Sequence, residues 1–200
     1  MRTLLVATTN PGKLREIRQL MAGVPIRLLS LADLPPIEEP EETGTTFEEN
    51  ARLKAHYYSA RSGLWTVAED SGLVIDALGG APGVKSARFL RADATYPERF
   101  AEIYRRLDAR AGTSRTARFV AALASVEDGR IVYETTGVVE GTIADAPRGS
   151  GGFGYDPIFF YAPYKRTLAE VTEPEKIEVA HRGIAFRKFA AWATSQENGK

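Results

Sequence analysis

The chain has 200 residues, 44% of them hydrophobic, and its 26 basic residues balance its 26 acidic residues. This length and composition suit a folded domain and argue against disorder, and the zero net charge excludes the broad basic surface that binds nucleic acids or membranes non-specifically. The absence of cysteine and the presence of only two histidines exclude disulfides, thiol nucleophiles and multi-histidine zinc sites, so any metal should have oxygen ligands, as Mg²⁺ or Mn²⁺ does.

The start of the chain predicts a strand, a loop and a helix. The apolar run 4–7 is short enough for a buried strand, and the turn-forming residues 8–12 follow it. Leu14 and Ile17 belong to an apolar stripe at helical spacing, which predicts a helix after this turn. Residues 24–29 are typical of a second strand.

A proline- and glutamate-rich segment, residues 34–44, predicts a loop rather than a linker, because structured signals resume directly after it. Thr46 and Glu49 then form a Thr-x-x-Glu capping box, which predicts a helix that runs to Gly63. The apolar run 64–68 predicts a further strand.

The second half of the chain predicts both helices and strands. The expected elements are a helix from Tyr96, a hairpin with strands 117–126 and 131–139, an aromatic strand 158–161, a capped helix after Thr172 and a terminal helix from His181. Crossover units together with a hairpin predict an α/β architecture with a mixed sheet. We expect one domain over residues 1–200.

Two adjacent acids, Glu69 and Asp70, follow the strand 64–68 and precede a Ser-Gly pair, so we expect them on a turn at the strand end. Neighbouring carboxylates repel each other unless solvent, a proton or a cation relieves the charge. Magnesium is a suitable cation, because one or two carboxylates and substrate phosphates commonly hold it. The alternative is a solvated acidic turn.

The residues 8–13, Thr-Thr-Asn-Pro-Gly-Lys, place hydroxyl groups, an amide and a lysine at a strand-to-helix turn. Exposed backbone N–H groups and the helix dipole favour anions at such a turn, which indicates a phosphate site. The spacing is not that of a Walker P-loop, and a plain capped turn is the alternative. Asn50 and Lys54 lie four residues apart on one helix, so they can face the same ligand.

Residues 150–156 combine four kinds of feature in one segment: glycines, a phenylalanine, a tyrosine and an acid. The glycines allow close approach to a ligand and Phe153 can stack on a planar base, although the segment is equally consistent with a flexible corner or with core packing. His181 and Arg182, with Lys176 upstream, offer donors for carbonyl or phosphate oxygens or else a surface pair. Ser71 has no identified base to activate it as a nucleophile.

Five motifs occur in order along the chain. They are Thr-Thr-Asn-Pro-Gly-Lys (8–13), Glu-Glu-Thr-Gly-Thr-Thr-Phe-Glu-Glu-Asn-Ala (41–51), Glu-Asp-Ser-Gly-Leu with Leu-Gly-Gly-Ala-Pro-Gly-Val (69–84), Gly-Gly-Phe-Gly-Tyr-Asp-Pro-Ile-Phe (151–159) and His-Arg-Gly (181–183). Together they closely resemble the inosine/xanthosine triphosphate pyrophosphatase family over nearly the whole chain. Glu69 stands where family members commonly carry a second aspartate, and Thr9 stands where a glycine is frequent.

The resemblance implies Mg²⁺-dependent hydrolysis of ITP, dITP or XTP to the monophosphate and pyrophosphate by a homodimer. It also implies an elongated mixed sheet flanked by helices, with two lobes and a central cleft. The implied substrate contacts are Thr8, Thr9, Asn10, Pro11, Gly12, Lys13, Lys54, Ser71, Phe153, Gly154, Tyr155, Asp156, Lys176, His181 and Arg182. Glu42 and Asp70 would serve the metal, and Asp70 and Lys13 would serve catalysis.

The resulting hypothesis is in-line attack of water on the α-phosphorus, with Lys13, Lys54 and magnesium offsetting the charge of the triphosphate. Asp70 is expected to be essential, as base, metal ligand or both. The alternatives are a related pyrophosphatase for modified pyrimidine nucleotides and a non-catalytic nucleotide sensor. No apolar run approaches the length of a membrane span and no signal-peptide pattern is present, so we expect a cytoplasmic protein that acts on a small molecule, without a nucleic-acid or membrane partner.

Overall fold

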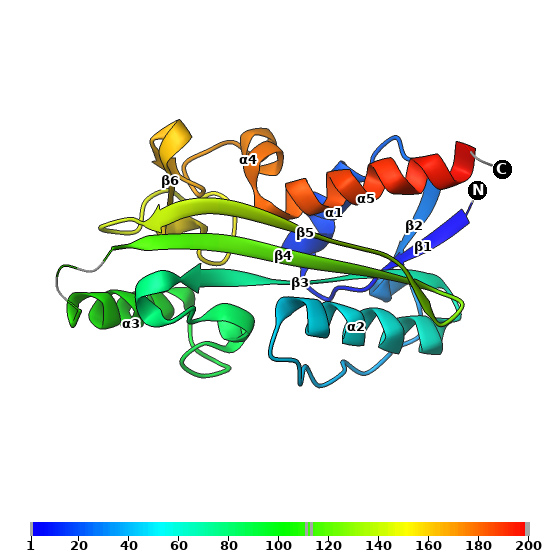
Figure 1. Cartoon of the computed structure of the whole chain (residues 1–200), viewed down its shortest axis with the longest axis horizontal. Helices are drawn as coiled ribbons and strands as arrows, with labels where there is room; N and C mark the ends of the chain where they lie inside the picture. The colour runs from blue at the N-terminus through cyan, green and yellow to red at the C-terminus, as the bar shows by residue number, and fades with distance from the viewer. Residues whose placement is uncertain (1, 111, 113, 199–200) are drawn as a thin grey trace. The chain divides into compact units, whose positions relative to one another are not determined.

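The computed structural model describes residues 2–110, 112 and 114–198. Within these residues, one mixed sheet has the strand order β2-β1-β3-β4-β5-β6-β7 (Figure 1). The strands are β1 (Arg2–Val6), β2 (Ile26–Ser30), β3 (Trp65–Ile75), β4 (Thr116–Glu127), β5 (Arg130–Ile143), β6 (Phe159–Tyr161) and β7 (Arg166–Thr167). Strand β1 pairs in parallel with β2 and β3, whereas β6 pairs antiparallel with β5 and β7. The predicted α/β architecture with a mixed sheet is confirmed.

The described helices agree closely with the local sequence signals. They are α1 (Pro11–Leu20), α2 (Phe47–Ser62), α3 (Tyr96–Asp108), α4 (Glu173–Val179) and α5 (His181–Asn198). Capping boxes at Thr46/Glu49 and Thr172/Glu175 open α2 and α4, as predicted. No helix in the described part of the chain is long and apolar enough to cross a membrane.

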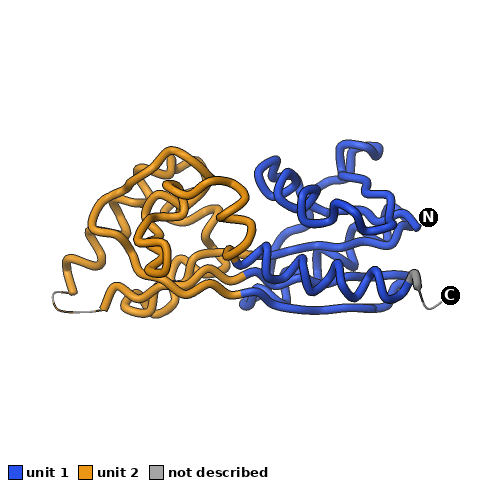
Figure 2. The backbone as a smooth tube through the Cα atoms, turned by 90° about the horizontal axis from the view of Figure 1, so that it is seen from above, with its two compact units in different colours: residues 1–70, 121–137, 181–200 blue, residues 71–120, 138–180 orange. Residues whose placement is uncertain are grey.

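The chain divides into two compact units, shown in different colours in Figure 2. Unit 1 comprises residues 1–70, 121–137 and 181–200, and unit 2 comprises residues 71–120 and 138–180. The predicted division into two parts is therefore confirmed. The central cleft stays a prediction.

The core of unit 1 joins helices α1 and α5 to the first strands of the sheet. Ile17 of α1 and Phe186 and Phe189 of α5 are at most 1% exposed, and they share one apolar cluster with residues of β1 and β3. Leu4 and Val6, which alternate along β1 and so point to the same face, belong to this cluster. In Figure 1, α5 and α1 lie together on one side of these strands, and α2 lies on the other side.

The core of unit 2 forms around α3. Phe100, Ile103 and Leu107 recur at helical spacing, so they share one face of α3, and all three are buried. The rings of Phe119 and Phe159, whose centroids are 4.6 Å apart, extend the same cluster.

Strand β3 corrects the sequence prediction for this segment. We expected the strand to end at residue 68 and a turn at Ser71 and Gly72. Instead, β3 continues through Ser71 and Gly72 to Ile75. Gly72 is needed for close packing, because a Cβ atom there would lie 2.3 Å from the Ser86 Oγ and 2.6 Å from the Gly83 carbonyl oxygen. The same Ser86 hydroxyl accepts a hydrogen bond from the Leu73 N–H at 3.0 Å. Close packing against Gly83 and Ser86 therefore explains Gly72, and a turn of the backbone does not.

The β4–β5 hairpin is confirmed, and its second strand runs four residues further than predicted, to Ile143. Asp128 and Gly129 connect the strands with φ values of 50° and 74°. Positive φ at both central residues is typical of the type I′ turn, whose twist matches that of the paired strands.

Replacing Gly137 with alanine should destabilise the protein by about 3 kcal/mol. The added Cβ would lie 2.1 Å from the His181 carbonyl oxygen and 2.8 Å from the Ala185 nitrogen, both in the backbone of α5. Backbone atoms in a packed helix cannot move aside as a flexible side chain can, so β5 and α5 must separate. Urea unfolding measures the change, with Val138→Ala, at an exposed neighbour, as the control. Equal stability of the two variants would contradict the prediction.

Candidate active site

The two acids at the centre of the sequence argument lie on opposite faces of β3. Successive side chains of a strand point to opposite sides of the sheet, and Glu69 and Asp70 are adjacent within β3. Glu69 binds Arg182 of α5, whereas Asp70 binds Asn50 and Lys54 of α2. The expected turn with two carboxylates in one site is therefore wrong, and each acid belongs to a separate cluster.

The Asp70 cluster combines an amide, an ammonium group and a second carboxylate. Asp70 Oδ2 accepts a hydrogen bond from Asn50 Nδ2 at 3.1 Å, and Asp70 Oδ1 accepts one from Lys54 Nζ at 3.1 Å. The Lys54 ammonium also binds Glu42 Oε1 at 2.7 Å. Asn50 and Lys54 therefore face the same partner from one side of α2, as their spacing predicts.

Asn50 also anchors the loop that carries Glu42. Its side chain is fully buried, and its Oδ1 accepts a hydrogen bond from the Gly44 N–H at 2.8 Å. One amide thus fixes both the carboxylate of Asp70 and the end of the loop that leads from Glu42. The Asn50 amide is buried, and both its oxygen and its nitrogen have hydrogen-bond partners, as buried polar groups usually do.

The two acids of this cluster keep Lys54 charged. Burial alone would lower the pKa of Lys54, but the attractions of Asp70 and Glu42 outweigh burial and raise it above its ordinary value. Lys54 is therefore charged, and its ammonium group binds both carboxylates. Positive charge near two carboxylates favours their ionised forms.

The donor set of Glu42 and Asp70 fits Mg²⁺ as it is commonly bound. Among the described residues, no group of three or more His, Cys, Asp or Glu side chains forms a metal cluster. Magnesium, however, is often held by one or two carboxylates together with substrate phosphates, and these two acids match in number and in kind.

The second cluster surrounds Arg182, which is 2% exposed. Its Nε and Nη2 donate to the two carboxylate oxygens of Glu69 at 2.7 and 2.8 Å, and its Nη1 donates to Glu16 of α1. Burial alone would raise the pKa of Glu69, but the charges of Arg182 and Lys13 outweigh it and hold that pKa far below its ordinary value. Arg182 therefore ties β3, α1 and α5 together, and its predicted substrate contact stays a prediction.

The predicted phosphate loop is a capped helix start. Asn10 Oδ1 accepts hydrogen bonds from the N–H groups of Gly12 and Lys13, at 2.9 and 3.1 Å, and Pro11 is the first residue of α1. The side chain of Thr8 accepts from the Asn10 N–H at 3.2 Å, and Thr9 is exposed. The first N–H groups of a helix have no partner within the helix, and Asn10 already binds two of them here. The side chain of Lys13 is therefore the main group of this loop that could bind an anion.

The charges of both clusters act on Lys13. Its Nζ is 3.5 Å from Glu69 Oε1, and its side chain is 18% exposed. Burial lowers the pKa of Lys13, Glu69 opposes this effect, and the nearby charges of Arg182 and Lys54 lower the pKa further.

The glycine-aromatic segment lies in unit 2, where a buried ion pair holds it. Lys176 Nζ donates to Asp156 Oδ2 at 2.6 Å and lies 4.3 Å from the centre of the Phe153 ring. Asp156 Oδ2 also accepts from the Phe153 N–H at 2.8 Å. Gly152 allows this arrangement, because a Cβ there would lie 2.1 Å from the same oxygen.

Tyr155 belongs to the core of unit 2, since it is 3% exposed and its hydroxyl donates to the Ser86 carbonyl at 2.8 Å. The loop thus uses Tyr155 and Asp156 to hold its own shape, while Gly154 has a φ of 69°, which favours glycine. Ser71, half-buried in β3, and His181, the buried first residue of α5, complete the predicted set. Their roles stay predictions.

Sequence reasoning missed Glu16. This residue is 3% exposed although it is charged, because it binds Arg182. A signal was present: Glu16 stands four residues before Leu20 and so shares a face of the helix with this apolar residue, where a charge indicates a buried partner.

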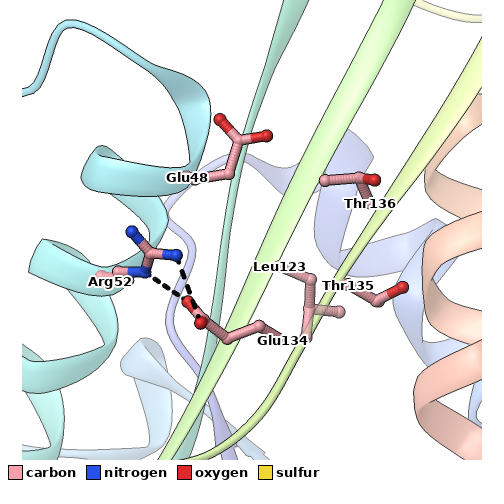
Figure 3. A pocket seen from close by; sticks show the side chains of 6 residues that line it. All are labelled: Glu48, Arg52, Leu123, Glu134, Thr135 and Thr136. Atoms are coloured by element: carbon pink, nitrogen blue, oxygen red, sulfur yellow. Dashed lines mark hydrogen bonds and ion pairs between the residues drawn. The ribbon is translucent and has the colours of Figure 1, made fainter.

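A separate cavity of about 180 Å³ lies in unit 1 between α2 and the β4–β5 hairpin (Figure 3). Its lining residues are Glu48, Arg52, Leu123, Glu134, Thr135 and Thr136. Arg52 forms a two-point ion pair with Glu134 there, and no predicted site residue lines the cavity.

Comparisons with known proteins agree with the ordered motifs. The chain is 50% identical over 190 residues to a dITP/XTP pyrophosphatase of Gloeobacter violaceus, with 94% of this chain and 93% of the relative covered. It is 44% identical to a dITP/XTP pyrophosphatase of Geobacillus kaustophilus, with 94% and 93% covered. A HAM1 protein structure from Coxiella burnetii matches with a TM-score of 0.89 and 38% identity, covering 98% of this chain and 100% of that one. Residues 4–192 match the Ham1 family, and the chain therefore belongs to that family.

Proposed function

We propose that this protein hydrolyses non-canonical purine nucleoside triphosphates, namely ITP, dITP or XTP, to the nucleoside monophosphate and pyrophosphate. The observation that carries the proposal is the near full-length match, at 44–50% identity, to relatives named dITP/XTP pyrophosphatase. The protein is accordingly a nucleoside triphosphate diphosphatase. The geometry of the Asp70 cluster provides a physical account of how it would act.

Positive side chains would hold the triphosphate. Lys13 stands at the start of α1 and Lys54 stands on α2, and both can bind phosphate oxygens as point charges. The reaction is in-line attack of water on the α-phosphorus, with pyrophosphate as the leaving group. The two ammonium groups offset the charge that develops on the leaving pyrophosphate.

Asp70 would orient or deprotonate the attacking water. Each carboxylate oxygen can accept two hydrogen bonds, so Asp70 can bind a further donor while it holds Asn50 and Lys54. Because Asn50 and Lys54 fix its carboxylate, Asp70 can hold the water in line with the α-phosphorus. Glu42 and Asp70 would hold Mg²⁺, for which Mn²⁺ is a substitute, and the bound metal would supply Lewis-acid stabilisation of phosphate charge.

Phe153 offers a planar apolar face for a purine ring. The Lys176 ammonium over this ring supports a stack with an electron-rich base, and the buried Lys176–Asp156 pair keeps the loop fixed. Inosine and xanthosine carry a 6-oxo group where adenine carries an amine, so a hydrogen-bond donor such as His181 or Arg182 would favour them. The family resemblance supports a homodimer and a cytoplasmic location as further parts of the proposal.

A panel of nucleotides tests the proposal. The protein should release pyrophosphate from ITP, dITP and XTP with a kcat/KM at least about a hundredfold above that for dATP, since a mismatched buried donor costs about 1–3 kcal/mol per group. EDTA should abolish turnover, and Mg²⁺ should restore it. A preference for modified pyrimidine nucleotides would overturn the base assignment, and tight nucleotide binding without turnover would overturn the enzymatic one.

A further inference from the structure

We infer that Glu69 is a positioning residue for Lys13: its carboxylate, held by Arg182, fixes the ammonium group of Lys13 through an ion pair at the start of α1. This inference rests on the proposed function only for its consequence in catalysis. The placement of Glu69 itself stands on contacts within unit 1.

The first observation is how firmly the Glu69 carboxylate is held. Both of its oxygens accept hydrogen bonds from one guanidinium, from Nε at 2.7 Å and from Nη2 at 2.8 Å. The side chains of Glu69 and Arg182 are each 2% exposed. A two-point pair of this kind fixes the plane of the carboxylate, so Glu69 cannot turn to follow a mobile partner.

The second observation is that the same carboxylate faces the phosphate loop. Glu69 Oε1, which accepts from Arg182, also lies 3.5 Å from Lys13 Nζ. Glu16 holds the other side of the guanidinium and stands on the same helix as Lys13, three residues later. The Glu16–Arg182–Glu69 chain therefore fixes the position of the first turn of α1 relative to β3.

The third observation is the balance of charge around Lys13. Arg182 and Lys54 both act to remove its proton, as does burial, which is the largest effect. Glu69 is the largest opposing influence, and Asp70 is a smaller one. Without the charge of Glu69, Lys13 would stand beside two cations with one weaker anion, and the neutral amine would become more favourable.

The consequence concerns the nucleotide-free protein. An ammonium group binds phosphate oxygens through charge, whereas a neutral amine offers little attraction. Glu69 would thus contribute to triphosphate binding without touching the metal or the substrate. Because Glu69 points to the opposite face of β3 from Asp70, it would not share the metal that Asp70 would hold.

Competitive labelling of the nucleotide-free protein with acetic anhydride tests the inference. Only the neutral amine reacts, so the extent of Lys13 acetylation against pH, read by peptide mass spectrometry, gives the midpoint for its titration. In E69Q this midpoint should fall by about one to three pH units. The matched control is E134Q, which removes a carboxylate from the two-point ion pair with Arg52 elsewhere in unit 1; its midpoint should equal that of the wild type.

An unchanged midpoint in E69Q, or an equal fall in E134Q, would overturn the inference. If E69Q does not fold, E69D keeps the charge but moves it away by about one carbon–carbon bond, and its midpoint should lie below that of the wild type; an equal midpoint would overturn the inference. Because no nucleotide is present, the labelling result does not depend on the proposed function. Release of pyrophosphate from dITP by E69Q and wild type is measured separately, and lack of turnover in both would reject the proposed function alone.

Discussion

Asp70→Asn should lower the turnover of dITP by about a thousandfold or more and leave the fold intact. The substitution preserves the shape of the side chain but removes the charge that binds Lys54 and that would hold a metal or a water. Asn50 keeps its hydrogen bond to the Gly44 N–H, and Glu42 still binds the Lys54 ammonium, so the cluster should keep its shape. The measurement is pyrophosphate release at saturating dITP, together with a urea unfolding curve.

The matched control is Asp76→Asn, which makes the same chemical change at an exposed acid of unit 2. Asp76 binds Thr116 and Arg118 and has no contact with the Asp70 cluster among the interactions described above. It should retain the rate of the wild type. Pyrophosphate release by Asp70→Asn at a rate near that of the wild type would contradict the assignment of Asp70.

Arg182→Met should destabilise the protein by about 3–5 kcal/mol, even though methionine fills a similar volume. The substitution would leave the carboxylates of Glu16 and Glu69 buried, with 4% and 2% of their side chains exposed, and without the guanidinium that binds both. An uncompensated buried charge costs more than the ion pair contributes, so the loss is expected to exceed that of a surface pair. Urea unfolding at neutral pH measures it.

Two further variants separate charge from packing. The triple variant Glu16→Gln, Glu69→Gln, Arg182→Met removes all three charges and should recover most of the lost stability, because no carboxylate is then left buried without a cation. Arg187→Met, at an exposed position of the same helix, should change the free energy of unfolding by less than about 0.5 kcal/mol. A free energy for Arg182→Met equal to that of Arg187→Met would contradict the electrostatic account.

The local parts of the fold could be predicted because their signals are local. The Thr46/Glu49 capping box alone determines where α2 begins, and the four-residue spacing of Asn50 and Lys54 alone places them on one face. The same holds for the Asp128–Gly129 turn of the hairpin. Each of these predictions depends on residues within about one helical turn or one hairpin, so no distant contact was needed to make them.

The partners of Glu69 and Asp70 could not be predicted, because they are residues far away in the sequence. Glu69 and Asp70 were expected on a turn, but Ser86 accepts a hydrogen bond from the backbone next to Gly72 and the strand continues. Once both acids are in a strand, alternation separates them, and repulsion between neighbouring carboxylates no longer explains their chemistry. Arg182 lies 113 residues from Glu69 in sequence, so its role as the partner of Glu69 has no local signal.

The most direct test of the account is hydrolysis of dITP in water enriched in ¹⁸O, with the products separated and weighed by mass spectrometry. Attack of water on the α-phosphorus predicts one ¹⁸O atom in dIMP and none in pyrophosphate, and this labelling should disappear together with turnover in Asp70→Asn. Label in pyrophosphate, or release of orthophosphate, would contradict the proposed reaction and the place assigned to Asp70 within it.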